Sequence, residues 1–335
     1  MRLGCVSIKK VIHDRVPVSC GETATGVASC PPQPVMLNTI YVARHAPRIA
    51  NEAVQVSRSL RDPMLSASGE EQTHEFAAFF DSMSCEERPQ LVICSPYTRC
   101  IKTALPLVKS LGLELCVEPG LAEWFAPVWP THTGKHPSPR AAEHVAPHFP
   151  AVSLRWTPLL YPNPDGESIP ALHMRMRECV RRIDDRCTAW GIDRVLLVSH
   201  AASAIALGRM LQTQGTFEDV CDKPIHAATA SLSKYVCKRD ASRNAADQVW
   251  SQEYNGATWF LKNGAEREWN FTFVPDNTTE PGMGPMWIDP YAPDPSLVYR
   301  TKLCAGLRRW CHGNSACSRS IAISNSVCGL RRSCP

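Results

Sequence analysis

The stretch TIYVARH, residues 39–45, is an apolar run that ends in an arginine and a histidine. Ile, Tyr and Val in succession favour a buried strand, which places Arg44 and His45 at the strand's carboxyl end. In open α/β sheets, ligands bind outside this edge. The pair therefore predicts an anion-binding pocket with an imidazole that attacks as a nucleophile or transfers a proton.

The segments around this strand alternate between strand and helix patterns. We expect strands over 38–44, 91–94, 113–117 and 194–199, and helices over 66–83, 95–111, 171–190 and 201–211. Ser66 or Ser68 is expected to cap the first of these helices, and Pro96 to lie in the first turn of the second. The alternation predicts an α/β fold with a mostly parallel sheet.

Other segments depart from this alternation. Residues 124–170 are rich in proline and predict a loop-rich insertion, which is a common place for substrate selection beside an active site. Strand-like alternation predicts a closing antiparallel set over 231–237, 248–254, 257–262 and 268–273. Residues 275–297, rich in Pro, Asp and Gly, are typical of a linker.

These patterns divide the 335 residues into three parts. We expect one domain over 36–274, which contains the insertion 124–170, between a tail at 1–35 and a linker and tail at 275–335. Both ends are rich in cysteine and serine and are unlike the middle. We interpret residues 1–35 and roughly 300–335 as disordered tails or as artefacts of gene prediction.

Composition argues against several classes of protein. The formal net charge of +4 is small for this length, so no direct nucleic-acid binding is expected. No run approaches the roughly 18 apolar residues of a membrane span, and the N-terminus lacks the apolar segment of a signal peptide. We therefore expect an intracellular protein, cytoplasmic or nuclear, that does not associate with membranes.

The 16 cysteines do not form a metal-binding pattern. Three lie in the first 35 residues and five in the last 32, and most of the others occur in apolar runs such as Val92-Ile93-Cys94. Buried thiols of this kind behave as small hydrophobes. No CxxC is present, so the sequence predicts no zinc site and no other metal or cofactor.

Polar motifs follow four of the expected strands. They are residues 44–48 (RHAPR), residues 95–104 (SPYTRCIKTA), residues 120–124 (GLAEW) and Ser199-His200. Because the carboxyl ends of parallel strands meet at one edge of a sheet, we expect these groups to lie close together.

In this order the motifs resemble those of the histidine phosphatase superfamily, which includes the phosphoglycerate mutases. The family pattern is Arg-His-Gly, then Ser-Pro-x-x-Arg-x-x-x-Thr-Ala, then a Glu and a second His. Here the corresponding residues are Arg44-His45-Ala46, Ser95 to Ala104 with Arg99 inside it, Glu123 and His200. The resemblance implies an α/β three-layer sandwich of the phosphoglycerate mutase-like type, with a mostly parallel central sheet. Ala46 replaces the family's glycine, so the turn there must use an ordinary φ.

The resemblance also implies a metal-independent phosphatase that acts on phosphomonoesters. His45 would attack phosphorus and form a phosphohistidine intermediate. Glu123 would protonate the leaving group and then activate water. These roles need neutral His45 and protonated Glu123, which predicts activity in mildly acidic to neutral solution.

Four cationic or hydrogen-bonding side chains would bind the phosphate in this scheme. Arg44 and Arg99 would hold phosphoryl oxygens in a fork geometry, and Arg48 would add a third contact. His200 would hydrogen-bond the same oxygens and stabilise charge in the transition state. The pocket then needs no metal, because these groups supply the positive field.

Each of these residues has a structural alternative. Arg44-His45 is also compatible with an ordinary strand-end pair, Arg99 with a surface arginine, and His200 with a satisfied core histidine. Glu123 is also compatible with a cap or a structural ion pair to Arg48. Gly166-Glu167-Ser168 resembles a recurring element of the mutase branch and is as compatible with a turn before the next helix as with a substrate contact. We expect the remaining histidines to be surface or insertion residues: His74, His132, His136, His144 and His148.

A second resemblance covers the segment after the expected phosphatase region. Residues 250–273 are similar to the corresponding part of fungal relatives of the phosphatase-like tau subunit of the RNA polymerase III transcription factor TFIIIC. This implies a scaffold subunit with little or no catalysis, with protein partners in a transcription complex and with Trp259 and Trp269 available for contact. The intact set of reactive residues favours the enzyme, whose substrate would be a phosphorylated small molecule or a phosphoprotein. Mutase activity is a weaker option, because no sequence feature indicates a site that retains a bisphosphate.

Overall fold

The computed structural model describes residues 35–49, 62–127, 136, 138–237, 249–273 and 287–288. The predicted N-terminal tail apart from Val35, almost all of the predicted linker and the C-terminal tail lie outside these residues. Within them, no helix has the length and apolar character that a membrane crossing requires.

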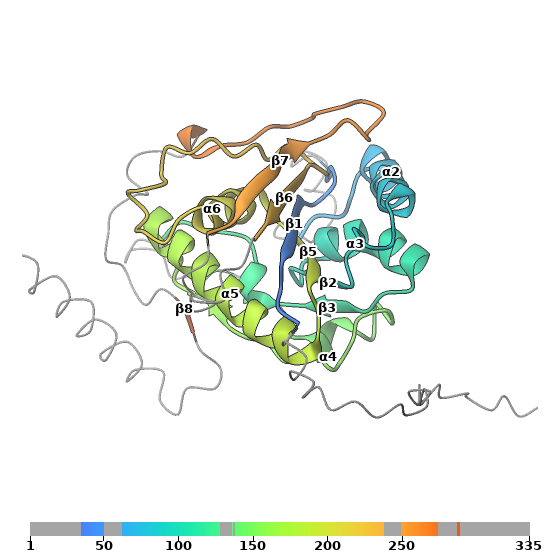
Figure 1. The fold of residues 1–335 in the computed structure, drawn as a ribbon, viewed down its shortest axis with the longest axis horizontal. Helices are drawn as coiled ribbons and strands as arrows, with labels where there is room; N and C mark the ends of the chain where they lie inside the picture. Colours follow the sequence, from blue (N-terminus) through green and yellow to red (C-terminus); the bar gives the residue numbers. More distant parts are fainter. Residues whose placement is uncertain are drawn as a thin grey trace, which may run out of the picture. The chain divides into compact units, whose positions relative to one another are not determined.

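A six-stranded mixed sheet organises the chain, in the order β3-β2-β5-β1-β6-β7 (Figure 1). Its parallel strands are β1 (Thr39–Arg44), β2 (Leu91–Cys94), β3 (Leu115–Val117) and β5 (Arg194–Ser199). β6 (Leu232–Val236) and β7 (Ser251–Ala257) continue it antiparallel beyond β1. The predicted mostly parallel α/β sheet is confirmed. Residue Arg44 is in register with Ser199, so the chain leaves β1 and β5 at the same level.

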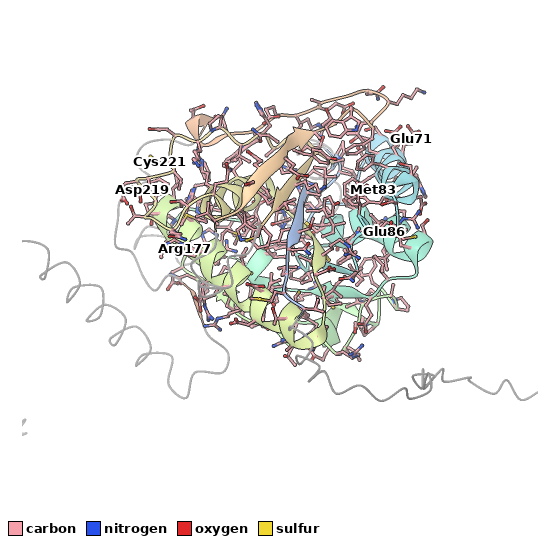
Figure 2. The ribbon with its side chains drawn as sticks, viewed as in Figure 1. Glu71, Met83, Glu86, Arg177, Asp219 and Cys221 are labelled. Carbon is pink, nitrogen blue, oxygen red and sulfur yellow. The ribbon has the colours of Figure 1, made fainter. Side chains whose placement is uncertain are left out.

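Helices cover both faces of the sheet and complete the three layers. Figure 1 shows α5 (Ile169–Trp190) and α6 (Ala201–Leu211) on one face, and α2 (Ala67–Ser82) and α3 (Thr98–Leu111) on the other. Alternate residues of β1 pack on opposite sides: Ile40 and Val42 join the cluster under α5 and α6, and Tyr41 joins the cluster under α2 and α3. Burial on both faces explains why the parallel strands are continuous apolar runs. Charged side chains labelled in Figure 2, such as Glu71, Glu86 and Asp219, are exposed.

Capping hydrogen bonds set the first residues of the helices, and the sequence predicted only some of them. Ser66 caps α2, because its Oγ accepts the Gly69 amide at 3.1 Å; Ser68 does not take this role. α3 begins at Thr98, so the prediction that Pro96 lies in its first turn was wrong. The Thr98 amide donates instead to the distant carboxylate of Asp62, which caps this helix from outside.

The first residues of α5 and β3 differ from the predicted ones, and hydrogen bonds explain both differences. α5 begins at Ile169 rather than 171, because Ser168 caps it and a proline is tolerated in the first helical turn. β3 begins at Leu115 rather than 113, because the Leu113 amide donates to the Val108 carbonyl and completes the end of α3.

Gly69 brings α2 against the chain that follows β1. A Cβ atom added at Gly69 would lie 2.0 Å from the Pro47 carbonyl oxygen, so only glycine allows this approach. The Ser66 amide donates to the same oxygen at 2.9 Å. The start of α2 thereby fixes the turn after His45.

The described residues of the insertion 124–170 are loop-rich, as predicted, and form two short elements before α5 begins at Ile169. They are α4 (Ala142–Val145) and β4 (Tyr161–Pro162). β4 pairs antiparallel with β8 (Trp287–Ile288), so part of the segment predicted to be a linker forms a strand.

The predicted strands over 257–262 and 268–273 were wrong. The first is a turn, in which the Leu261 amide donates to the Thr258 carbonyl. The second ends in the 3-10 turn η3 (Phe271–Phe273). The aromatic residues there pack ring against ring rather than alternating across a sheet: Phe260 stacks on Phe79 of α2 at 4.6 Å, and Trp269 lies 5.1 Å from Phe271. Trp259 is 63% exposed, whereas Trp269 is partly buried and packs against the core.

Candidate active site

His45 lies directly after β1 and is almost completely buried. Its amide donates to the Ser199 carbonyl at 2.9 Å, which ties it to the end of β5. Its Nδ1 lies 2.8 Å from the Ala46 carbonyl oxygen, so Nδ1 carries the proton and Nε2 keeps a free lone pair. Burial, together with the charges of Arg99 and Arg44, holds the pKa of His45 well below its usual range. The ring is therefore neutral at neutral pH.

Ala46 fits the turn after His45 without strain. Among the described residues that are not glycine, positive φ occurs only at Ala230 and Arg267, so Ala46 has the ordinary φ that its side chain requires. The Ala46 amide donates to Thr103 Oγ1 at 3.0 Å, and this hydroxyl donates to the Arg99 carbonyl at 2.7 Å. Thr103, of the Ser-Pro motif, thus links the His45 turn to α3.

His200 faces His45 from the end of β5, with ring centroids 5.4 Å apart. Arg99 Nη2 donates to His200 Nδ1 at 3.0 Å, so the proton is on Nε2, which donates to Ser95 Oγ at 2.8 Å. Burial and the charge of Arg99 hold the pKa of His200 well below its usual range. His200 is neutral and, although fully buried, its partners are the polar groups of this site.

Arg99 lies at the centre of the site and is only 3% exposed, so the surface-arginine alternative was wrong. Its Nη1 pairs with Asp62 Oδ1 at 3.3 Å and its Nη2 with Glu123 Oε2 at 3.1 Å. Its guanidinium carbon lies 4.7 Å from the centre of the Tyr97 ring. The guanidinium of Arg99 is therefore paired with two carboxylates.

Arg44 is held by two backbone carbonyls. Its Nη1 donates to Ala227 O and to Arg267 O, each at 2.6 Å. Burial lowers the pKa of Arg44 to about 10. The Nε atoms of Arg44 and Arg99 are both buried without a hydrogen-bond partner. Unsatisfied cationic donors are costly in the interior, and an anion would satisfy both.

Arg48 lies close to these groups. Its pKa is lowered by burial and by the charge of Arg99. Its backbone pairs with Leu65 in an isolated bridge beside the start of α2. The six predicted site residues are therefore brought to one edge of the sheet: Arg44, His45, Arg48, Arg99, Glu123 and His200.

Glu123 reaches this edge from the turn after β3. Its Oε2 accepts from Arg99, lies 3.3 Å from His200 Nδ1, and its Oε1 accepts the Trp124 amide at 3.1 Å. The side chain is 26% exposed, the most open of these partners apart from Asp62. Glu123 thus forms an ion pair with Arg99.

A buried ion pair between Arg175 and Glu167 fixes the turn that carries Glu123. Arg175 of α5 binds Glu167 through Nε at 2.7 Å and through Nη2 at 2.8 Å, and both side chains are almost fully buried. Arg175 Nη1 donates to Gly120 O at 2.6 Å and to Ala122 O at 3.2 Å. The pair therefore fixes the backbone immediately before Glu123.

Glu167 also fixes the backbone after Glu123. Its carbonyl accepts Trp124 Nε1 at 2.7 Å and its amide donates to Phe125 O at 2.9 Å. Gly166, with φ of 91°, is needed because an added Cβ would lie 2.3 Å from Ala126 O. The Gly-Glu-Ser element is thus a turn that supports Glu123 and starts α5, since Ser168 caps that helix.

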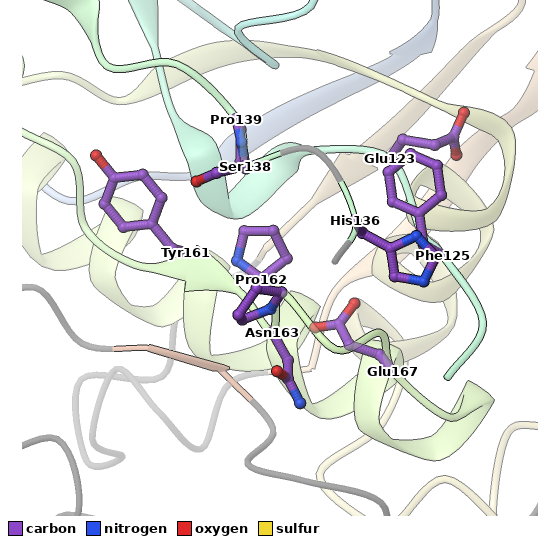
Figure 3. Close-up of a pocket in the computed structure, with 10 residues that line it drawn as sticks. Glu123, Phe125, His136, Ser138, Pro139, Tyr161, Pro162, Asn163 and Glu167 are labelled. Carbon is purple, nitrogen blue, oxygen red and sulfur yellow. The ribbon is translucent and has the colours of Figure 1, made fainter. Parts of the chain in front are cut away.

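A cavity of about 100 Å³ lies beside the Glu123 turn (Figure 3). Phe125 and His136 stack in it with centroids 4.7 Å apart, and His136 Nε2 bonds the Ala126 carbonyl at 2.8 Å. Tyr161 and Asn163 also line it. His136 is therefore part of the insertion's packing, as expected of an insertion residue.

The structure adds two partners that the sequence did not single out. Asp62 binds Arg99 and the start of α3, and nothing in its local sequence pattern marks it. Ser95 orients His200, and its place in the Ser-Pro motif was a usable signal. Among the residues that the structure describes, no group of three or more His, Cys, Asp or Glu has an arrangement suited to a metal ion.

A sequence profile of the histidine phosphatase superfamily (branch 1) matches residues 40–245, more than half of the chain. The chain belongs to this superfamily. The transcription factor tau 55 kDa subunit of Saccharomyces cerevisiae is 30% identical over 269 residues, which are 72% of this chain and 60% of that protein. The chain therefore matches less than two thirds of the length of this superfamily relative.

Two solved structures resemble this chain at low identity. The ecdysone phosphate phosphatase from Bombix mori, solved with tungstate, has a TM-score of 0.51 at 14% identity over 71% of this chain and all of that one. A mycobacterial glucosyl-3-phosphoglycerate phosphatase, solved with inorganic phosphate, has a TM-score of 0.45 at 20% identity over 67% of this chain and all of that one. The first agrees with the three-layer fold described above.

Proposed function

We propose that this protein is a phosphatase that hydrolyses phosphomonoesters through a phosphohistidine intermediate at His45, without a metal ion. The observation that carries the proposal is the state of His45. Its Nδ1 is bound to the Ala46 carbonyl, so Nε2 is unprotonated and lies within a cluster of arginines. A neutral imidazole held in one tautomer beside buried, unsatisfied guanidinium donors is suited to attack on a bound phosphate.

The first half-reaction transfers the phosphoryl group to the enzyme. The substrate's phosphoryl oxygens replace Asp62 and Glu123 on Arg99 and bind the unsatisfied Nε atoms of Arg44 and Arg99. His45 Nε2 forms a bond to phosphorus as the bond to the leaving oxygen breaks. Glu123 gives that oxygen a proton, so the product leaves as an alcohol.

The second half-reaction regenerates the enzyme. Glu123, now a carboxylate, takes a proton from water, and the hydroxide attacks the phosphohistidine. The P–N bond breaks, inorganic phosphate leaves and His45 is again neutral. Arg44, Arg48 and Arg99 stabilise the negative oxygens in both steps, and His200 Nδ1 holds Arg99 in place by accepting from its Nη2.

Hydrolysis of an aryl phosphate in the presence of EDTA tests this proposal. The wild type should turn over the substrate and be inhibited by vanadate. His45→Ala should lose at least about 10³-fold in rate, because the covalent route is absent. Full activity of His45→Ala would refute the mechanism.

A second candidate function is a subunit of a transcription-factor complex in the nucleus. The 30% identity to the tau 55 kDa subunit favours it, as does the 63% exposed Trp259 beside β7. Absence of turnover in the pure protein, together with stoichiometric co-purification of transcription-factor subunits from its own cells, would support this function over catalysis.

A further inference from the structure

Arg267 has a backbone conformation that its side chain disfavours. Its φ is 50°, in the left-handed region, and the residue is exposed. Residues other than glycine keep such a conformation only where the surroundings impose it, and such sites are often functional. The other described case, Ala230, is buried beside His45, to whose carbonyl its amide donates.

Hydrogen bonds on both sides hold Arg267 in place. The Glu266 carbonyl accepts the Thr229 amide at 2.9 Å, and Glu268 Oε1 accepts the Ala227 amide at 2.7 Å. Between them, the Arg267 carbonyl accepts Arg44 Nη1 at 2.6 Å. The segment 266–268 is therefore bonded to Arg44. We call Arg44, Arg48 and Arg99, the arginines proposed to bind phosphate, the phosphate clamp.

The Arg267 side chain adds a positive charge to this clamp. Its Nη1 donates to the Arg48 carbonyl at 2.8 Å. Its charge is one of the causes that lower the pKa of Arg44 and of Arg48, after burial.

The described part of the chain gives Arg267 no carboxylate within ion-pair distance. The adjacent Glu268 is engaged elsewhere, with the Ala227 amide and 3.9 Å from His226 Nδ1. Arg267 therefore carries a positive charge that no described carboxylate neutralises in an ion pair, and such a charge favours the binding of an anion.

The same segment leads towards the leaving-group side of the site. Phe271, four residues beyond Arg267, lies 6.0 Å from the ring of Trp124, the residue after Glu123. Arg267 thus lies in a segment that runs from the phosphate clamp to the turn that carries the proposed general acid. This segment is outside the residues 40–245 that match the superfamily.

We propose that Arg267 binds a second anionic group on the substrate, a carboxylate or a further phosphate, next to the phosphoryl group. The chain therefore prefers phosphomonoesters with an acidic leaving group over neutral ones. This inference rests on the proposed phosphatase function. Arg267 acts in substrate selection, while Arg44, Arg99 and His45 act on the phosphoryl group itself.

Comparison of phenyl phosphate with 4-carboxyphenyl phosphate tests the inference. The wild type should show a higher kcat/KM for the carboxylated substrate, and this preference should shrink as salt is added. In Arg267→Ala, kcat/KM for the carboxylated substrate should fall about tenfold, mainly through KM, and that for phenyl phosphate less than about twofold. Lys262→Ala, which removes an exposed charge from the same segment, should behave as wild type.

Arg267→Gly keeps the test valid if Arg267→Ala fails to fold. Glycine adopts positive φ freely, so this variant should be at least as thermostable as wild type and should lose the preference as Arg267→Ala does. Equal losses on both substrates, or a wild type without the preference, would overturn the inference. If the wild type hydrolyses neither substrate, the proposed function fails. Calorimetric binding of phenylphosphonate and 4-carboxyphenylphosphonate to wild type and Arg267→Ala then decides the role of Arg267.

Discussion

The ion pair between Arg175 and Glu167 offers a way to move the proposed general acid without touching it. Arg175→Met removes the guanidinium that binds Glu167 and the carbonyls of Gly120 and Ala122. Glu167 would remain as a buried carboxylate without its cation. Breaking such a pair costs about 3–5 kcal/mol, a large share of the 5–15 kcal/mol that stabilises a typical domain.

The double variant Glu167→Gln with Arg175→Met separates this cost from the effect on catalysis. Neutral side chains of similar volume in place of a buried pair are often tolerated, so most of the stability should return. Gly120 O still loses its partner, which costs about 1–3 kcal/mol, whereas Ala122 O keeps Ser203 Oγ at 2.8 Å. The turn before Glu123 should therefore loosen in a folded protein.

The assay compares two leaving groups. p-Nitrophenolate leaves without protonation, so hydrolysis of p-nitrophenyl phosphate should fall less than about threefold in the double variant. Phenyl phosphate needs the acid, and general acid catalysis contributes about 10²–10⁴-fold, so its hydrolysis should fall at least about 30-fold. Arg181→Ala, on the exposed face of the same helix, is the control and should change neither rate. Equal losses on both substrates would refute the claim that this pair positions Glu123.

Three further predictions concern the surroundings of the site. His173 is buried and burial lowers its pKa to about 4, so it is neutral in the folded state and protonates more readily in the unfolded state. The free energy of unfolding should therefore fall as the pH drops from about 6.5 to 4. In His173→Gln, denaturant titrations at each pH should show a dependence of this free energy on pH that is weaker by up to about 1.4 kcal/mol per pH unit, and an unchanged dependence would be the contrary result. Ser95→Ala removes the hydroxyl that accepts from His200 Nε2 at 2.8 Å and orients the ring, and should lower kcat about tenfold with little change in KM; a pure KM effect would contradict this role. Gly69→Ala places a Cβ atom 2.0 Å from Pro47 O, so it should lower the free energy of unfolding by about 1–3 kcal/mol and reduce kcat by moving the turn after His45. A variant that melts and turns over like the wild type would show that the close contact between α2 and Pro47 is unimportant.

The fold and the reactive residues could largely be predicted because their signals are local. Each parallel strand is buried on both faces and therefore reads as a continuous apolar run, and each polar motif directly follows such a strand. That adjacency predicts that Arg44, His45, Arg99 and His200 lie at one edge of the sheet.

The contacts that tune the site could not be predicted, because their partners are distant in sequence. Asp62 reaches Thr98 and Arg99 across more than 30 residues, and Arg267 reaches Arg44 across 223. The aromatic residues of 257–273 alternate in a strand-like manner, yet they pack on α2 and on Trp124, so their periodicity was misleading. Residue types alone do not distinguish these two uses of an aromatic side chain.

Direct trapping of the intermediate tests the central claim. Wild-type protein would be mixed with a ³²P-labelled aryl phosphate, quenched within milliseconds, and the labelled residue identified by mass spectrometry. Our account predicts an acid-labile, alkali-stable phosphoryl group on His45 that is absent from His45→Ala. Steady turnover by the wild type without label on His45, or the same label in His45→Ala, would contradict it.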